Sequence, residues 1–401
     1  MTVFFGLLLV YGLGFWEMVK LVSPLPERLR DITFPIWDQY SFSKHGGLVF
    51  LSSDDFEKGV AYSNHAVGYL LFMYLFYKIE LLIPQLPMRA VVASLEMVFC
   101  VLAVVYVALS GQRERVKFHQ GVLILLAVMF LLTMPGFWIS AGKFNVDNPF
   151  HFQFPILLLG AHRISQGVVS GVKLWLPLGA LCVTTPMAAA LLGMYQVVSS
   201  IRNDGLSKNM LKLGVVVILI SVVVYLQPVI ISKALGFSSN NSSWLFRSGL
   251  DGDVSYFTNV LNSVISPYFP RPVYLLALPT GLLLAQLAII AIRAHDDGKG
   301  KALLVGSGNP ILFYGVIFSQ YLVTSLLWPQ AVSIHPYLYD FMLIAPIFVW
   351  IALNLAQSHS LLNNPRVWIW VMLFFISFNL QQIAQAARCA DCYYPSWAIK
   401  S

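Results

Sequence analysis

A stretch of acidic and aromatic residues between positions 23 and 65 holds the side chains best suited to chemistry. Asp38 follows Trp37 and precedes Tyr40 by two positions. A carboxylate placed there can act as a general base that removes a proton from a hydroxyl group. Asp54 and Asp55 follow in the segment S-S-D-D-F-E. They would form a second acidic contact, bind a divalent metal ion, or cap a short helix, and the cap is what this pattern favours.

Cationic side chains near the predicted outer ends of helices would suit a phosphate group. Arginine offers a planar fork that matches two phosphate oxygens. Arg271 stands in F-P-R-P-V-Y before an apolar run, where it would contact a phosphate or anchor the chain at a membrane interface. His335 would contact an anion or cap a helix. The candidate cations are His335, Arg271, Arg247, Lys233, Lys44 and His65.

Several acids lie within or near apolar runs, and an ionisable group inside a membrane is a functional candidate by default. Glu17 with Lys20, and Glu80 with Lys78, are close enough to the ends of their runs to reach the interface. Glu96 lies deeper in its run, in A-S-L-E-M-V-F. There it would line a cavity or pair with a polar neighbour.

The composition is that of an integral membrane protein. Hydrophobic residues make up 58% of the 401 residues and charged residues only 11%, with a mean hydropathy of +0.73. A soluble domain has about 25% charged residues. Apolar runs of about 20 residues recur, each long enough to cross about 30 Å of hydrocarbon, and in lipid such runs must be helices. The net charge of +7 comes mainly from short loops, so it does not indicate nucleic-acid binding.

We therefore predict an all-α, polytopic transmembrane bundle of about eleven helices, forming a single integral membrane domain over residues 1–401. The fifth predicted helix contains His162 and Arg163, so it would be short or re-entrant. The predicted spans are 3–22, 66–86, 89–110, 120–141, 153–170, 175–198, 211–232, 272–293, 309–328, 337–356 and 366–386.

The orientation follows from the basic loops, since cytoplasmic loops are rich in Lys and Arg. One such loop holds Arg202, Lys208 and Lys212, and another holds Arg293, Lys299 and Lys301. Counting back through the spans places the loops 23–65 and 233–271 outside. The basic loop with Arg113, Arg115 and Lys117 does not fit this count.

The order of residues in the first loop resembles the opening of GT-C glycosyltransferases, membrane enzymes that take sugars from polyprenyl phosphate carriers. In that family an acidic residue follows the first helix, then a glycine-containing stretch, then a His-Pro-Pro-like segment that leads into the second helix. Asp38, Gly46–Gly47 and His65–Leu70 match these features. Gln39 stands where many members have a second acid, and Ala66 and Val67 replace the two prolines.

Two later segments agree with this resemblance. Residues 147–186 begin D-N-P and end T-T-P, similar to a helix start and a Thr-Lys-Pro-like end in the family, although the lysine is missing. The segment H-P-Y-L-Y-D-F-M-L-I-A-P places His335, Tyr337 and Pro346 where the family has a basic residue, a tyrosine and a proline.

The resemblance implies a GT-C-like fold with amphipathic helices in the first outer loop and an inverting sugar transfer at the outer face of the membrane. The donor would be a polyprenyl-phosphate-linked sugar, and the acceptor a glycan or a lipid-linked glycan. Membrane lipids would be further partners, in a bacterial inner membrane with the site facing the periplasm. Asp38 would be the base. The resemblance does not specify a cofactor, and a divalent metal ion would be compatible with it. The implied binding residues are His65, Tyr40, His335, Tyr337, Arg271, Asp54 and Asp55.

Two other classes of protein remain open. A transporter or flippase for a lipid-linked or polar solute would use Glu96 and the interrupted helix at His162–Arg163. An outer-leaflet polysaccharide polymerase or ligase would depend on outer-loop cations such as Arg247 and Arg271 rather than on Asp38.

Overall fold

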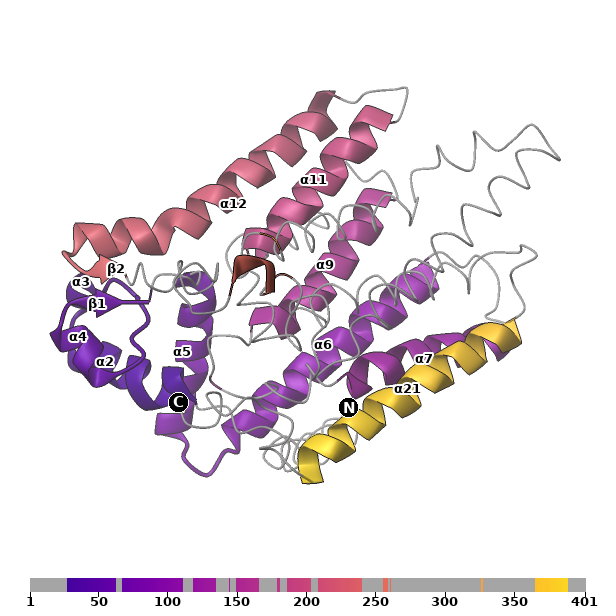
Figure 1. The fold of residues 1–401 in the computed structure, drawn as a ribbon, viewed down its shortest axis with the longest axis horizontal. Helices are drawn as coiled ribbons and strands as arrows, with labels where there is room; N and C mark the ends of the chain where they lie inside the picture. Colours follow the sequence, from indigo (N-terminus) through magenta and orange to yellow (C-terminus); the bar gives the residue numbers. More distant parts are fainter. Residues whose placement is uncertain are drawn as a thin grey trace.

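The computed structural model describes residues 27–62, 67–110, 118–134, 144, 149–165, 179–180, 186–202, 208–239, 255–258, 260, 326 and 365–388. This part of the chain is mostly helical (Figure 1). The short helices are η1 (Leu29–Thr33), α2 (Phe34–Gln39), α3 (Phe42–His45) and α4 (Ser53–Glu57). The longer helices are α5 (Val67–Leu82), α6 (Met88–Ser110), α7 (Phe118–Thr133), α9 (Pro149–Ser165), α11 (Pro186–Arg202), α12 (Lys208–Ala234) and α21 (Pro365–Arg388).

Two of these helices are long and apolar enough to cross a membrane. They are the segments Met88–Val107 of α6, with 20 residues and a mean hydropathy of 2.4, and Leu211–Ala234 of α12, with 24 residues and 2.6. At about 1.5 Å per residue each reaches about 30 Å or more. The 16 residues of α5 reach only about 24 Å, so this helix is shorter than the span predicted over 66–86.

The other predicted spans divide into two groups. The described parts of the predicted spans 120–141, 153–170, 175–198 and 366–386 contain the helices α7, α9, α11 and α21, whose apolar parts are shorter than a full span. The fifth helix, predicted as weak, is α9 and runs through His162 and Arg163. The spans 3–22, 272–293, 309–328 and 337–356 lie outside the described residues.

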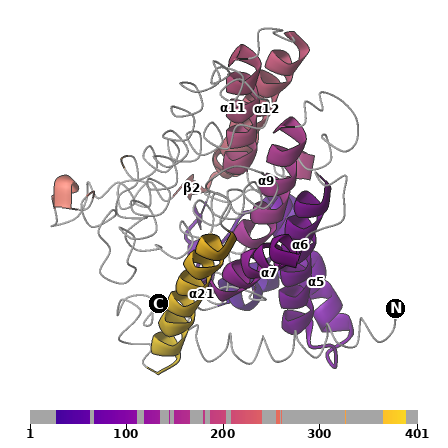
Figure 2. The same ribbon diagram turned by 90° about the vertical axis from the view of Figure 1, so that its right-hand side faces the viewer.

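The long helices pack through small residues and a few buried polar contacts. Helices α11 and α12 form a hairpin in which a Cβ added at Gly193 would lie 2.8 Å from the carbonyl oxygen of Gly214. Helix α21 lies beside α7 in both views (Figure 1, Figure 2), although more than 200 residues separate them. The buried Asn379 amide donates to Thr133 Oγ1 at 3.3 Å and so joins these two helices.

The first loop folds into a compact unit, residues 27–62, which we call the first-loop module. Its apolar side chains pack along α5, where Tyr69, Leu70, Met73 and Tyr77 follow the i, i+3/i+4, i+7 spacing of one helix face. The module runs along nearly the whole helix. Arg30 contacts Glu80 near one end of α5, and at the other end an added Cβ on Gly47 would lie 2.9 Å from Val67. The shared core consists of Leu29, Phe34, Trp37, Val49, Tyr69, Leu70, Met73, Tyr77, Met88, Val92 and Phe144.

The module also docks on the end of α12. Gly46 adopts a left-handed φ of 59°, and a Cβ there would lie 2.4 Å from Ile231 Cγ2. Strand β1 (Val60–Ala61) pairs in parallel with β2 (Ser238–Ser239), and the Ser238 amide donates to Gly59 O at 2.7 Å. Short helices in the first loop are confirmed, and Gly46 is where the loop meets α12.

The contact at Gly46 predicts a large effect of a small substitution. Gly46→Ala should destabilise the protein by about 2–5 kcal/mol, because a left-handed alanine costs about 1–2 kcal/mol and overpacking adds about 1–3 kcal/mol. The measurement is thermal unfolding of the detergent-solubilised protein. Gly59→Ala is the matched control. Gly59 has a φ of 67° and nothing within 4 Å of an added Cβ, so it carries only the backbone cost. Equal losses in the two variants would contradict the docking contact.

Candidate functional site

Asp38 lies in a cluster of three polar side chains between the first-loop module and α5. It stands near the end of α2, and its Oδ1 atom accepts a hydrogen bond from the Tyr74 hydroxyl and an ion pair from Lys78 Nζ. Tyr74 and Lys78 are four residues apart, so they lie on the same face of α5 and reach the same oxygen. The Lys78 ammonium also lies 5.3 Å from the centroid of the Tyr74 ring.

The three side chains remain accessible from outside. The Asp38 side chain is 25% exposed and the Lys78 side chain 42% exposed. The second carboxylate oxygen, Oδ2, makes no hydrogen bond to any residue that the structure describes. The cluster thus presents a carboxylate, an ammonium group and a phenol to a ligand, which suits recognition of hydroxyl groups and of an anion.

An aromatic support fixes the backbone beneath Asp38. The neighbouring Trp37 is buried, and its indole N–H donates to Leu48 O at 2.9 Å. The Trp37 ring stacks on the His45 ring at 5.2 Å between centroids, and it lies 5.3 Å from the Tyr74 ring. Because Trp37 is held on several sides, the next residue along the chain cannot shift far from α5.

His45 is the buried partner in this support. Its Nδ1 atom accepts a hydrogen bond from the Gly47 amide at 3.0 Å, so the neutral ring carries its proton on Nε2. Burial lowers the pKa of His45, and a hydrogen bond to the backbone of Tyr40 opposes this only in part. The neutral imidazole therefore stabilises the Gly46–Gly47 turn that docks on α12.

The other acids of the first loop have structural partners. Asp55 caps α4, because its Oδ2 accepts the Ser52 and Leu51 amides at 3.0 and 3.2 Å while its own amide donates to Ser52 Oγ. Asp54 forms an exposed ion pair with Lys58 at 3.3 Å. The capping interpretation is confirmed for Asp55. Within the described residues, no group of three or more His, Cys, Asp or Glu side chains is placed to hold a metal ion.

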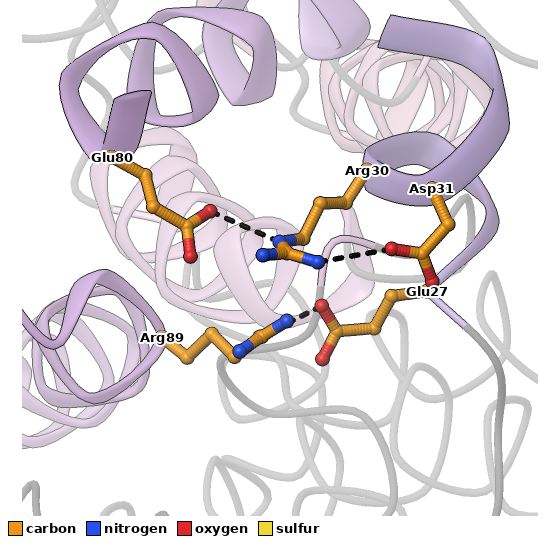
Figure 3. A network of polar contacts seen from close by, with 5 residues as sticks. All are labelled: Glu27, Arg30, Asp31, Glu80 and Arg89. Atoms are coloured by element: carbon orange, nitrogen blue, oxygen red, sulfur yellow. Dashed lines mark hydrogen bonds and ion pairs between the residues drawn. The ribbon is translucent and has the colours of Figure 1, made fainter. Parts of the chain in front are cut away.

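A second group of charges holds the start of the module against the turn between α5 and α6. Figure 3 shows Arg30 pointing between Glu80 of α5 and Asp31, with Arg89 of α6 pointing to Glu27. The Arg30–Glu80 and Arg89–Glu27 distances are 3.2 and 2.8 Å. Burial opposes the charge of Arg30, but Glu80 and Asp31 outweigh it and raise its pKa. Lys78 and Glu80 therefore form ion pairs with residues of the module, whereas the sequence had indicated that they extend to the membrane interface.

Of the other predicted binding residues in the first loop, Tyr40 is described and makes its contacts apart from the Asp38 cluster. The Tyr40 ring packs on Phe56 at 4.5 Å, and the Lys44 ammonium lies 5.8 Å from its centroid. His65, Arg271, His335 and Tyr337 lie outside the described residues.

Sequence reasoning missed Tyr74, Lys78 and His45. The signal for the first two was a Tyr-x-x-x-Lys spacing in an otherwise apolar helix, which places two polar groups on one face.

In comparisons with protein families, with curated proteins and with solved structures, the chain has no significant match.

The environment of His45 predicts how stability depends on pH. Burial in the folded protein lowers the pKa of His45, so the unfolded chain takes up a proton more readily once the pH falls below its ordinary pKa of about 6.5. Its contribution should be fully present above about pH 6.5 and should decline as the pH falls below that value, by at most about 1.4 kcal/mol per pH unit. Thermal unfolding at about pH 7.5 and pH 5.5 measures this.

The control for this experiment is His45→Asn, whose amide oxygen can still accept from Gly47 but does not titrate. The difference in melting temperature between the two pH values should be smaller in this variant than in the original protein. An unchanged difference would contradict the role assigned to His45.

Proposed function

We propose that the protein is a membrane-embedded glycosyltransferase of the GT-C type. It would move a sugar from a polyprenyl phosphate donor to a glycan or a lipid-linked acceptor at the outer face of a bacterial inner membrane. One observation carries the proposal. Asp38, the residue that the resemblance makes the base, is held at the surface of a folded first loop, with Oδ1 bound and Oδ2 without a hydrogen bond to any residue that the structure describes.

The reaction that this site would support is a single displacement at the anomeric carbon of the donor sugar. The acceptor oxygen attacks this carbon as the bond to the phosphate oxygen breaks, and Asp38 Oδ2 takes the proton from the acceptor hydroxyl. The departing phosphate keeps the bonding electrons, so its charge must be met by cations or hydrogen-bond donors. Lys78 and Tyr74 lie beside the base, and Arg271 and His335 are the predicted outer-loop groups.

The packing of the first-loop module supports the predicted orientation. The module contacts the end of α12 through Gly46 and Ile231 and through the pairing of β1 with β2. The loop that begins after α12 therefore starts on the same side as the first loop.

Replacing Asp38 by asparagine tests the proposal directly. The amide would keep the shape and the hydrogen bond from Tyr74 but could not accept a proton, so transfer should fall by about 100-fold or more. The measurement is transfer of labelled sugar from polyprenyl phosphate sugars in membranes that contain equal amounts of the inserted variants. Glu57→Gln is the matched control, because Glu57 is an exposed acid of the same loop that was not placed in the site. Full activity of the Asp38→Asn protein would remove Asp38 from the mechanism.

Assays in the same membranes distinguish the proposed glycosyltransferase from the other two classes of protein. Movement of the labelled lipid across the bilayer without chemical change would indicate a flippase. Loss of polymer formation in Arg247→Ala and Arg271→Ala, with Asp38→Asn unaffected, would indicate a polymerase or ligase.

The orientation can be tested by labelling single cysteines with a membrane-impermeant maleimide, after the four native cysteines have been replaced. Asp54→Cys in the module and Lys233→Cys at the end of α12 are both exposed positions. Both should react from the outside of intact cells, with Lys212→Cys at the start of α12 as the control that reacts only after lysis. Opposite labelling of positions 54 and 233 would contradict the shared face.

A further inference from the structure

The face of α5 that the first-loop module does not cover carries a stripe of exposed leucines next to the Asp38 cluster. Leu71, Leu75 and Leu82 are 45%, 56% and 80% exposed. With Lys78 they follow the i, i+4, i+7, i+11 spacing of a single helix face. A stripe of this kind is costly in water, because each partly exposed leucine forgoes part of the about 1.5–3 kcal/mol that its full burial would contribute. We call these three residues and the adjoining Leu81 the leucine stripe.

The polar cluster lies at the border between this stripe and the covered face of the same helix. Leu70, Met73 and Tyr77, on the far side of Tyr74, are buried under the first-loop module. Tyr74 and Lys78 thus stand in line along α5, with the module on one side and the leucine stripe on the other. A cation at the edge of an exposed apolar stripe is complementary to an anionic head group attached to a hydrocarbon chain.

We propose that the leucine stripe and Lys78 bind an isoprenoid lipid phosphate, with its chain along the leucines and its phosphate on the Lys78 ammonium. This inference rests on the proposed function, because it places the carrier of the donor sugar on α5. A phosphate at Lys78 would compete with Asp38 Oδ1 for the same ammonium group. Binding of the donor would therefore release the carboxylate from its ion pair next to the reacting centre.

The test is direct binding to the full-length protein in phosphatidylcholine nanodiscs. The probe is labelled farnesyl phosphate, a short isoprenoid phosphate, and a diazirine derivative maps its position. Adducts should fall on the residues of α5 that include Leu75. Farnesol should bind about ten-fold more weakly, since it lacks the charge-assisted contact, and inorganic phosphate should not compete at the same concentration.

Substitutions at Lys78 test the phosphate contact. Lys78→Gln should weaken farnesyl phosphate binding by about ten-fold or more, and Lys78→Arg should stay within about three-fold, because the arginine keeps the charge. Asp38→Asn should bind the probe at least as tightly as the original protein, because the competing carboxylate is gone.

Substitutions at leucines test the contact with the hydrocarbon chain of the lipid. Leu75→Asn should reduce both affinity and adducts on α5. Leu219→Asn is the matched control, because Leu219 is 60% exposed on α12, away from the cluster. It should leave binding unchanged.

Several outcomes would overturn the inference. These are adducts elsewhere than α5, equal binding of farnesol, full binding by Lys78→Gln, or competition by phosphatidylglycerol as strong as that by farnesyl phosphate. Failure of this inference is distinct from failure of the proposed function. If the inference alone is wrong, Asp38→Asn still abolishes transfer while the Lys78 variants bind normally. If the function alone is wrong, the probe binds as described while Asp38→Asn transfers sugar normally.

Discussion

The packing of the first-loop module against one face of α5 is the interaction on which the rest of the described structure depends. Phe34 lies at its centre, buried between Trp37, Tyr74, Tyr77 and Phe144, with ring centroids 5.3–6.4 Å apart. Aromatic side chains of this size bury much apolar area and pack in defined geometries. Once Phe34 is in place, the short helix α2 can lie only along α5, and Asp38 at its end must meet Tyr74 and Lys78.

This packing also explains why charges are tolerated beside an apolar helix. A charge taken out of water is costly unless it is paired. The module supplies a partner for each charged residue of α5, with Asp38 for Lys78 and Arg30 for Glu80. Removing one member of a partly buried pair leaves the other without compensation. The acids and bases of the first loop are therefore required for its docking on α5, because they pair with the charges of that helix.

The sequence predicts the local features of this arrangement well. Helical periodicity places helices at α5, α6 and α12 to within a few residues, and Ser-Ser-Asp-Asp predicts the cap of α4. Asp38 stands out because of its place after the first apolar run. These are properties of short stretches, in which spacing and residue type determine the local structure.

The contacts between distant segments could not be predicted in the same way. Lys78 and Glu80 lie near the end of their apolar run, so the sequence indicated that they reach the membrane interface, yet each pairs with a residue more than 35 positions away. His45 gives no sign in the sequence that its ring is buried against Trp37. Such contacts depend on how whole elements pack, which periodicity does not encode.

The short length of α5 is consistent with these contacts. A helix of about 24 Å crosses about 30 Å of hydrocarbon only where the bilayer thins or flanking side chains reach the interface. With the charged segment 27–39 packed along it, α5 behaves as part of the first-loop module, with one covered face and one apolar face left exposed. An element of that kind suits the boundary between water and lipid, where a hydrocarbon chain meets a polar head group. It is at this boundary that a base such as Asp38 would have to meet both a lipid-borne donor and a polar acceptor.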